Sequence, residues 1–150
     1  MNESIINGIN WNVGQDDILI CLGDWSFGGF EYIEEFRNRI VCKNVHLVLG
    51  NHDHHIERNR GDIRKIFTSV SDYETLIIDK RTFRLFHYPI QSWNGMNNGD
   101  IHLHGHVHLP PLMSDFNFIR IELVFTCFFV HEILVSFTNG IFITNCVSEC

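Results

Sequence analysis

The sequence predicts a mixed α/β domain, and three observations support this fold class. Two apolar runs of strand length, residues 17–23 and 45–50, flank a segment whose apolar residues have helical spacing. Farther along, two β-rich runs are separated by a short polar turn, which is typical of a hairpin. With 150 residues, of which 45% are hydrophobic and 19% charged, the chain is long enough for one domain with a core of its own.

The first expected element is a short helix at the N-terminus. Ile5, Ile6, Ile9 and Val13 fall at helical intervals, so they would share one face of the helix. The turn residues 14–17 follow directly and would end it.

A strand, helix, strand unit is expected next. The run 17–23 is bounded by turn residues, as in a strand that is buried on both faces. Residues 30–40 have acidic side chains early and basic ones late, which complements a helix dipole. The run 45–50 would form a second buried strand, and a connection of this length predicts parallel pairing of the two strands.

The second half of the chain begins with β-structure. Residues 73–78 and 82–86 are β-rich, and the Asp-Lys-Arg tripeptide between them indicates a hairpin. Residues 97–100 predict a turn, and residues 101–104 predict a brief strand ahead of a glycine.

Charge and cysteine usage restrict the class of partner and the compartment. The formal net charge of −7 argues against a general nucleic-acid-binding surface, so we expect a bound phosphate to need a metal. Five cysteines without a C-x-x-C pair, and a polar, acidic N-terminus instead of a signal peptide, predict a reducing, cytoplasmic location. We expect no membrane span, because no apolar run approaches about 20 residues. An oligomeric state does not follow from the sequence.

Polar residues that can bind metals follow four of the expected strands. In open α/β sheets, ligands bind at the carboxyl ends of strands. A glycine before three of the four groups would permit a tight turn and a close approach of the backbone to an ion. The four groups are Gly23-Asp24, Gly50-Asn51-His52-Asp53, His87-Tyr88-Pro89 and Gly105-His106-Val107-His108.

Each group alone also has a structural explanation. Asp24 could be a solvated loop residue or a helix cap, and residues 51–53 could be a capping cluster. His87 could be a core or surface histidine with an ordinary hydrogen-bond partner. In an extended segment His106 and His108 would project to one side, either towards a metal or as part of a polar edge strand.

Together and in this order, the four groups resemble the calcineurin-like metallophosphoesterase family. That family's pattern is Asp-x-His, Gly-Asp, Gly-Asn-His-Asp/Glu, a lone His and Gly-His-x-His, each after a strand. The last four are present, whereas no Asp-x-His precedes Asp24. The resemblance covers roughly residues 1–110 and is greatest to small bacteriophage and bacterial members.

The resemblance implies a sandwich of two mixed β-sheets flanked by helices. Because the chain begins inside what looks like the family's first helix, we expect the fold to lack its first strand. An unpaired sheet edge would then remain at the place of that strand.

The resemblance also implies a dinuclear metal centre. Asp24 would bridge two ions, Asn51, His87 and His106 would complete one of them, and His108 would bind the other. The remaining ligands of that second ion would belong to the absent Asp-x-His motif. Two divalent ions would lower the pKa of a bridging water, whose hydroxide attacks phosphorus in line. The mixed N and O ligands fit Mn, Fe, Zn, Ni or Co, with manganese favoured by the resemblance.

Neighbouring side chains have implied or open roles. His52 would be the catalytic imidazole, stabilising the transition state or protonating the leaving oxygen, and Asp53 could orient it. His54 could touch the substrate or be an exposed loop residue. His102 and His104 lie on the strand face of a ligand candidate, so either could replace a lost ligand.

Composition divides the chain into two parts. Residues 1–112 are assigned to an N-terminally truncated metallophosphoesterase domain, and residues 113–150 to an apolar segment of uncertain status. Residues 115–150 contain seven of the thirteen Phe and three of the five Cys. Within them, residues 119–124 or 141–144 could provide a strand that completes the second sheet.

Three functions remain open at this stage. The first is metal-dependent hydrolysis of phosphoester bonds, by a phosphatase or a phosphodiesterase. The second is a metal-binding remnant of such an enzyme with impaired catalysis, and the third is a non-enzymatic interaction module with an apolar tail. The natural substrate does not follow from the sequence.

Overall fold

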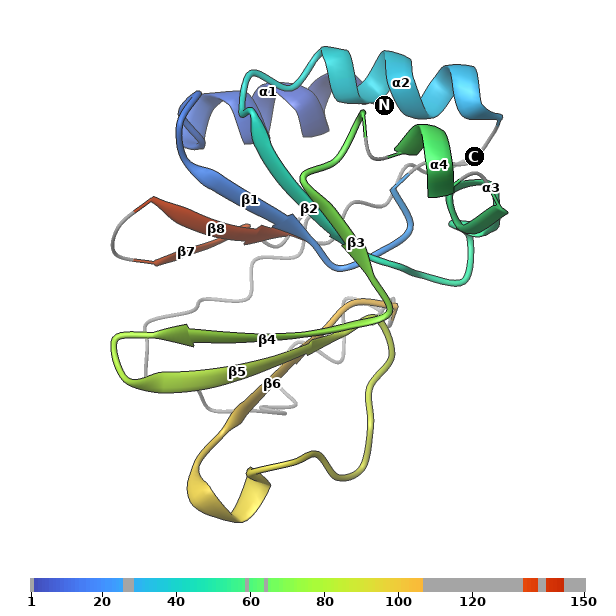
Figure 1. Cartoon of the computed structure of the whole chain (residues 1–150). Helices are drawn as coiled ribbons and strands as arrows, with labels where there is room; N and C mark the ends of the chain where they lie inside the picture. Colours follow the sequence, from blue (N-terminus) through green and yellow to red (C-terminus); the bar gives the residue numbers. More distant parts are fainter. Residues whose placement is uncertain are drawn as a thin grey trace, which may run out of the picture.

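The protein is built in three layers (Figure 1). Helices α1 and α2 cover one face of a first sheet, and a second sheet packs against the other face. The computed structural model describes residues 2–25, 29–58, 60–63, 65–106, 134–137 and 140–144.

The first sheet has five strands in the order β3-β2-β1-β8-β7. Its centre, β1, pairs in parallel with β2 on one side and with β8 on the other. Strand β1 is therefore paired along both of its edges, with β2 and with β8. The five strands are β1 (Ile18–Cys21), β2 (Asn44–Val48), β3 (Ser69–Ser71), β7 (Leu134–Phe137) and β8 (Ile141–Thr144).

Strand β1 is buried on both faces, as its continuous apolar run predicts. Leu19 and Cys21 pack into the cluster under the helices, whereas Ile20 and the following Leu22 pack towards the second sheet. A central strand between two layers has no face that tolerates polar side chains.

The helix layer is held by the apolar stripe of α1 (Asn2–Asn12) and by α2 (Phe30–Asn38). The predicted core face of α1 is confirmed by burial of Ile5, Ile6 and Ile9. Beside it the Trp25 ring is fully buried, between edge-on aromatic rings at 4.8 and 5.0 Å. Burying each such large side chain contributes about 1.5–3 kcal/mol.

The connection from β2 to β3 contains two short helices that the sequence analysis did not predict as separate elements. They are α3 (His54–Arg58) and α4 (Arg60–Ile63). Both follow the polar loop at the end of β2 and lie on the helix side of the first sheet (Figure 1), where Ile56 and Ile63 join the cluster under the helices.

The second sheet has the order β4-β5-β6, with bounds Tyr73–Ile78, Arg81–Phe86 and Ile101–His104. The predicted hairpin is confirmed, but its turn is one residue shorter than expected, since Arg81 pairs with Ile78. Asp79 and Lys80 form the turn, with φ of 49° and 66°. Positive φ at both positions matches the twist of the flanking strands.

The two sheets pack face to face through side chains that alternate along their strands. This apolar layer and the parallel and mixed pairings confirm the predicted sandwich fold. The layer contains Ile20, Leu22, Val48, Ile143, Ile78, Phe83 and Leu85.

The C-terminal part differs from the expectation in one respect. Residues 141–144 do form a strand, but it belongs to the first sheet and not to the second. Its parallel pairing with β1, of Ile18 with Ile141 and of Cys21 with Thr144, places this strand in the first sheet. Residues 119–124 lie outside the described residues, and the division at residue 112 stays a prediction. None of the helices in the described part of the chain has the length and apolarity needed to cross a bilayer.

Candidate metal centre

The carboxyl ends of β1, β2 and β5 and the segment after β6 bring four predicted side chains to one place. Asp24 follows β1, Asn51 follows β2, His87 follows β5 and His106 follows β6. A backbone hydrogen bond of 3.0 Å from the Gly105 N–H to the His87 carbonyl joins the last two loops. The first sheet thus contributes two oxygen donors and the second sheet two imidazoles.

The donor atoms of these residues are close together. One ligand atom from each of Asp24, His87 and His106 lies within 4.8 Å of the other two. The Asn51 Oδ1 lies 2.9 Å from the His106 Nδ1 and 3.0 Å from the His87 Nε2. Asp24 and His87 are buried, with 3% and 0% exposure, whereas Asn51 and His106 lie nearer the surface.

The His87 ring tests whether this group suits a cation. Its Nδ1 lies 2.7 Å from the Leu22 carbonyl oxygen, so the ring hydrogen belongs on Nδ1 and the lone pair on Nε2. Burial lowers the pKa of His87 and favours this neutral form. The Nε2 lone pair therefore faces the Asn51 Oδ1 and, at 3.4 Å, an Asp24 carboxylate oxygen. Lone pairs that converge in this way fit a divalent cation.

Two glycines allow the loops to approach this closely. A Cβ at Gly50 would lie 2.6 Å from the Asp24 backbone nitrogen and 2.8 Å from a ring carbon of His87. A Cβ at Gly23, where φ is +95°, would lie 2.8 Å from the Gly50 backbone. Both positions thus require glycine, as the motif analysis expected.

Two of the four donor residues have an unusual backbone. Asp24 has φ of 54° and His106 has φ of 65°, in the left-handed region. Such conformations cost about 1–3 kcal/mol each and cluster at functional sites. The Asp24 carboxylate is fixed further by a 3.0 Å hydrogen bond from the His52 backbone N–H.

The Asp53 carboxylate joins the first two loops. It accepts hydrogen bonds of 2.8 Å from the backbone N–H groups of Asp24, Trp25 and Gly50. Burial raises its pKa to about 6, although the three N–H groups favour the charged form. These contacts show that Asp53 positions the backbone on either side of the oxygen donors. A role of Asp53 in orienting His52 stays a prediction.

The other predicted site residues are placed as follows. His52 is exposed on the turn beside Asn51, and His54 is exposed at the start of α3. His108 lies outside the described residues. Burial is the main cause that lowers the pKa of His87, and a positive charge on His52 would lower it further.

His102 and His104 are not members of the donor cluster found among the described residues. Both ring nitrogens of His102 face backbone carbonyl oxygens, those of Arg84 at 3.0 Å and Tyr88 at 3.3 Å. The His104 Nδ1 lies 2.9 Å from the Gly105 carbonyl oxygen. His102 therefore ties β6 to its neighbours and has no ring nitrogen left for an ion.

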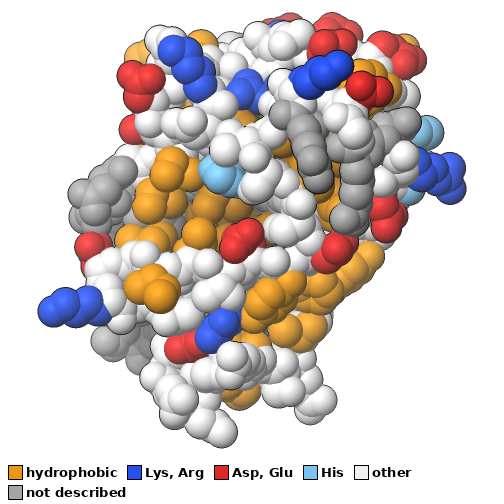
Figure 2. All heavy atoms as spheres, viewed as in Figure 1, with side chains coloured by type: hydrophobic (Ala, Val, Ile, Leu, Met, Phe, Trp, Pro, Cys, Tyr) orange, Lys and Arg blue, Asp and Glu red, His pale blue; other side chains and the backbone are white. Residues whose placement is uncertain are grey.

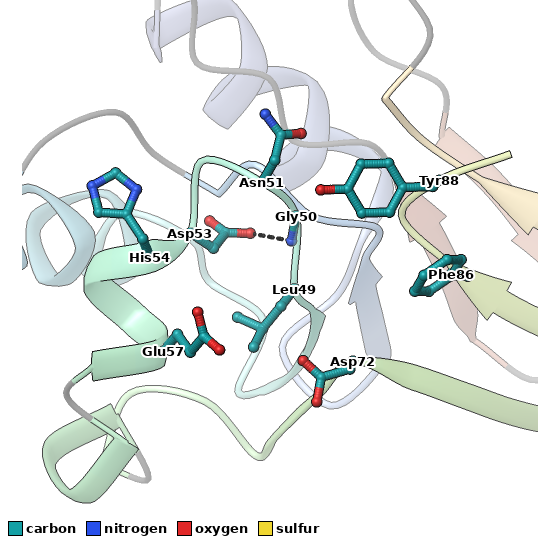
Figure 3. Close-up of a pocket in the computed structure, with 9 residues that line it drawn as sticks. All are labelled: Leu49, Gly50, Asn51, Asp53, His54, Glu57, Asp72, Phe86 and Tyr88. Atoms are coloured by element: carbon teal, nitrogen blue, oxygen red, sulfur yellow. Dashed lines mark hydrogen bonds between the residues drawn. The ribbon is translucent and has the colours of Figure 1, made fainter.

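A cavity beside Asn51 contains residues that the sequence analysis missed (Figure 3). It has a volume of about 220 Å³, and its walls include Glu57, Asp72, Phe86 and Tyr88. Tyr88 had a signal in the sequence, since it stands next to His87. The other three come from separate elements and share no motif.

Comparison with known proteins agrees with this geometry. The family model described as the calcineurin-like phosphoesterase superfamily domain matches residues 8–123. The fold is similar to a crystal structure of a protein of unknown function from Aquifex aeolicus, with a TM-score of 0.57 and 22% sequence identity. That match covers 73% of this chain and 66% of the other, so this chain spans just under two thirds of that protein's length. No curated protein sequence matches. From the family match over most of its length, the chain belongs to the calcineurin-like phosphoesterase superfamily.

Proposed function

We propose that the protein is a metal-dependent hydrolase of phosphoester bonds with a dinuclear centre. The observation that supports this most is the convergence of Asp24, Asn51, His87 and His106 at the ends of strands from both sheets. Membership of the phosphoesterase superfamily supports the same reaction class.

The four donors would hold the first ion, and Asp24 would share its second carboxylate oxygen with another. His108 would belong to that second ion. Divalent ions, when bound, act as Lewis acids on phosphoryl oxygens and make a water more acidic. The donor set of imidazoles, an amide and a carboxylate contains no thiolate and fits Mn, Fe, Zn, Ni or Co. Manganese is the ion we test first, because the family resemblance favours it.

His52 would supply the proton that the leaving oxygen needs. Its side chain is exposed beside Asn51, and its backbone N–H holds the Asp24 carboxylate. An imidazole suits this step because its ordinary pKa lies near neutrality. The substrate would therefore approach from the exposed side of the His52 turn.

Metal content and turnover test the proposal together. We expect the purified chain to retain about one equivalent of Mn²⁺ after dialysis and to hydrolyse bis-p-nitrophenyl phosphate slowly, because two ligands of the second ion would belong to the absent Asp-x-His motif. His87→Ala should abolish metal retention, and His52→Asn should abolish turnover while metal remains. His46→Asn is the matched control, since His46 bonds to Ser69 on β3 and should change neither property.

Two results would favour the alternatives. If the chain retains metal but shows no turnover that is lost in His52→Asn, it is an impaired metal-binding remnant. If neither manganese nor zinc binds more tightly to the unchanged chain than to His87→Ala, the proposal fails. A non-enzymatic interaction module would then be the better account.

A further inference from the structure

The cavity beside the candidate metal centre lies between elements of both sheets. Figure 3 shows Asn51 at one end, with Glu57 and Asp72 towards the other and Leu49 between them. Glu57 belongs to α3, whereas Asp72 lies between β3 and β4. A group attached to a phosphate at Asn51 would thus extend towards these two carboxylates.

One wall of the cavity is aromatic and continuous with the metal centre. Phe86 and Tyr88 lie on the same side of the cavity in Figure 3, with ring centroids 5.5 Å apart. The Tyr88 ring also packs edge-on against His87 at 4.9 Å and His106 at 4.8 Å. A ligand on this wall would therefore lie directly beside the donor cluster.

The walls of the cavity that the structure describes are negatively charged. Glu57 and Asp72 are exposed carboxylates at its wall, and none of the described residues that line it is Lys or Arg. The Asp53 carboxylate also lines the cavity and accepts from backbone N–H groups. Over the wider face in Figure 2, Lys and Arg side chains are spread among Asp and Glu. Anionic groups would be repelled from the cavity, whereas a cation would be attracted.

Resting on the proposed function, we propose that this cavity selects phosphoesters of amino alcohols. The phosphoryl group would lie at Asn51, a short carbon chain along Leu49, and a protonated amine between Glu57 and Asp72. Carboxylates and the faces of aromatic rings both attract an ammonium group. A volume of about 220 Å³ suits a small alcohol of this kind and is below the 300–1,000 Å³ typical of sites for larger ligands.

Binding of three small phosphoesters tests this inference without requiring turnover. Phosphoethanolamine and propyl phosphate have the same number of heavy atoms and differ in one terminal group, an ammonium or a methyl. Phosphoglycolate carries a carboxylate instead. Their Kd values for the Zn²⁺-loaded chain would be measured by isothermal titration calorimetry, with bound zinc counted in the same samples.

We expect phosphoethanolamine to bind about tenfold more tightly than propyl phosphate, a difference of about 1.4 kcal/mol, and phosphoglycolate to bind most weakly. In the double variant Glu57→Gln/Asp72→Asn the preference should fall below about twofold. The matched control Glu34→Gln/Glu35→Gln removes the same charge from exposed positions on α2 and should keep the preference.

Three results would overturn the inference. Equal affinity for phosphoethanolamine and propyl phosphate would show that the cavity does not select an amine, while the proposed function would stand. Loss of a zinc equivalent in the double variant would show that the two carboxylates hold an ion instead. If none of the three esters binds to the zinc-loaded chain, the proposed function fails together with the inference.

Discussion

The two sheets supply their halves of the metal centre in different ways. On the side of the first sheet, Asp24 is fixed by the His52 N–H, and Asp53 holds the surrounding backbone through three hydrogen bonds. On the side of the second sheet, the one described backbone group that hydrogen-bonds to the His87 ring is the Leu22 carbonyl, and the other nitrogen of the ring faces the donor atoms of the site. Within the described residues, the His106 ring contacts only Asn51, His87 and Tyr88.

This difference indicates which half of the metal centre is already positioned before an ion binds. The oxygen half is held by backbone hydrogen bonds that do not involve the ion. In the imidazole half, two ring nitrogens, of His87 and His106, lie 3.2 Å apart. Because a cation would satisfy both lone pairs at once, the position of His106 should depend on the ion much more than that of Asp24.

The largest effect should come from separating the two halves. Gly50→Ala places a methyl group 2.6 Å from the Asp24 nitrogen and 2.8 Å from the His87 ring. We expect the unfolding free energy to fall by about 1–3 kcal/mol, the usual cost of overpacking. Metal retention should be lost as well, which calorimetric titration with zinc would measure.

Gly61→Ala is the control for that substitution. Gly61 lies in α4, where a Cβ would meet nothing within 4 Å. Alanine at a compatible helical position should leave stability unchanged or raise it by up to about 1 kcal/mol. If Gly50→Ala behaves like Gly61→Ala, the close approach of the loops is not needed for the site.

A second prediction separates a donor histidine from a structural one. His87→Ala should weaken zinc binding by more than about 100-fold. Mutation of a residue that only hydrogen-bonds to a metal ligand already lowers metal affinity about 10–100-fold. His102→Ala should retain the metal but lose stability, because the carbonyl oxygen that accepts a hydrogen bond from the ring N–H loses its donor. Both imidazoles are buried, with 0% and 2% exposure. Equal metal loss in the two variants would contradict the assignment of His87.

Local patterns predicted the frame of the molecule and the residues at its strand ends. The helical spacing of Ile5, Ile6 and Ile9 and the continuous run 17–23 each depend on one element and its burial, so they could be read from the sequence. The hairpin was predicted for the same reason. The predicted turn was one residue too long, because the sequence does not show which of the flanking polar residues pairs with the opposite strand.

Long-range pairing and cavity walls could not be predicted in this way. The parallel contact of β1 with residues 141–144 joins segments more than 100 residues apart, and no local pattern specifies it. The cavity likewise combines Glu57, Asp72 and Phe86 from three elements. The three backbone amides that donate to Asp53 could not be predicted either, because its motif gives its neighbours in sequence but not the groups that fold around it.

A third prediction tests the rigid half by itself. In Asp53→Asn, one side-chain oxygen becomes an NH₂ group, so at least one of the three backbone donors loses its acceptor. An unsatisfied buried donor costs about 1–3 kcal/mol, and thermal unfolding should show a loss of this size. Asp17→Asn is the control, since the partly exposed Asp17 accepts from one backbone group, the Gly14 N–H, and an amide oxygen can replace it. Equal stability of the two variants would remove Asp53 from its positioning role.

The smallest effect concerns the response of the first sheet to acid. The His46 Nδ1 lies 2.7 Å from the Ser69 hydroxyl, between paired residues of β2 and β3. Burial lowers the pKa of His46 below its ordinary value of 6.5, against an opposing effect of Glu74. The unfolded chain therefore takes up this proton first as the pH falls below about 6.5, and folding becomes less favourable.

In His46→Gln the unfolding free energy should fall less steeply between pH 7 and pH 5, measured by urea unfolding of the metal-free chain. Most of the slope should remain, because burial also lowers the pKa of His87 and His104 beside the second sheet. A variant with an unchanged or steeper slope would show that acid destabilises the molecule through groups other than His46.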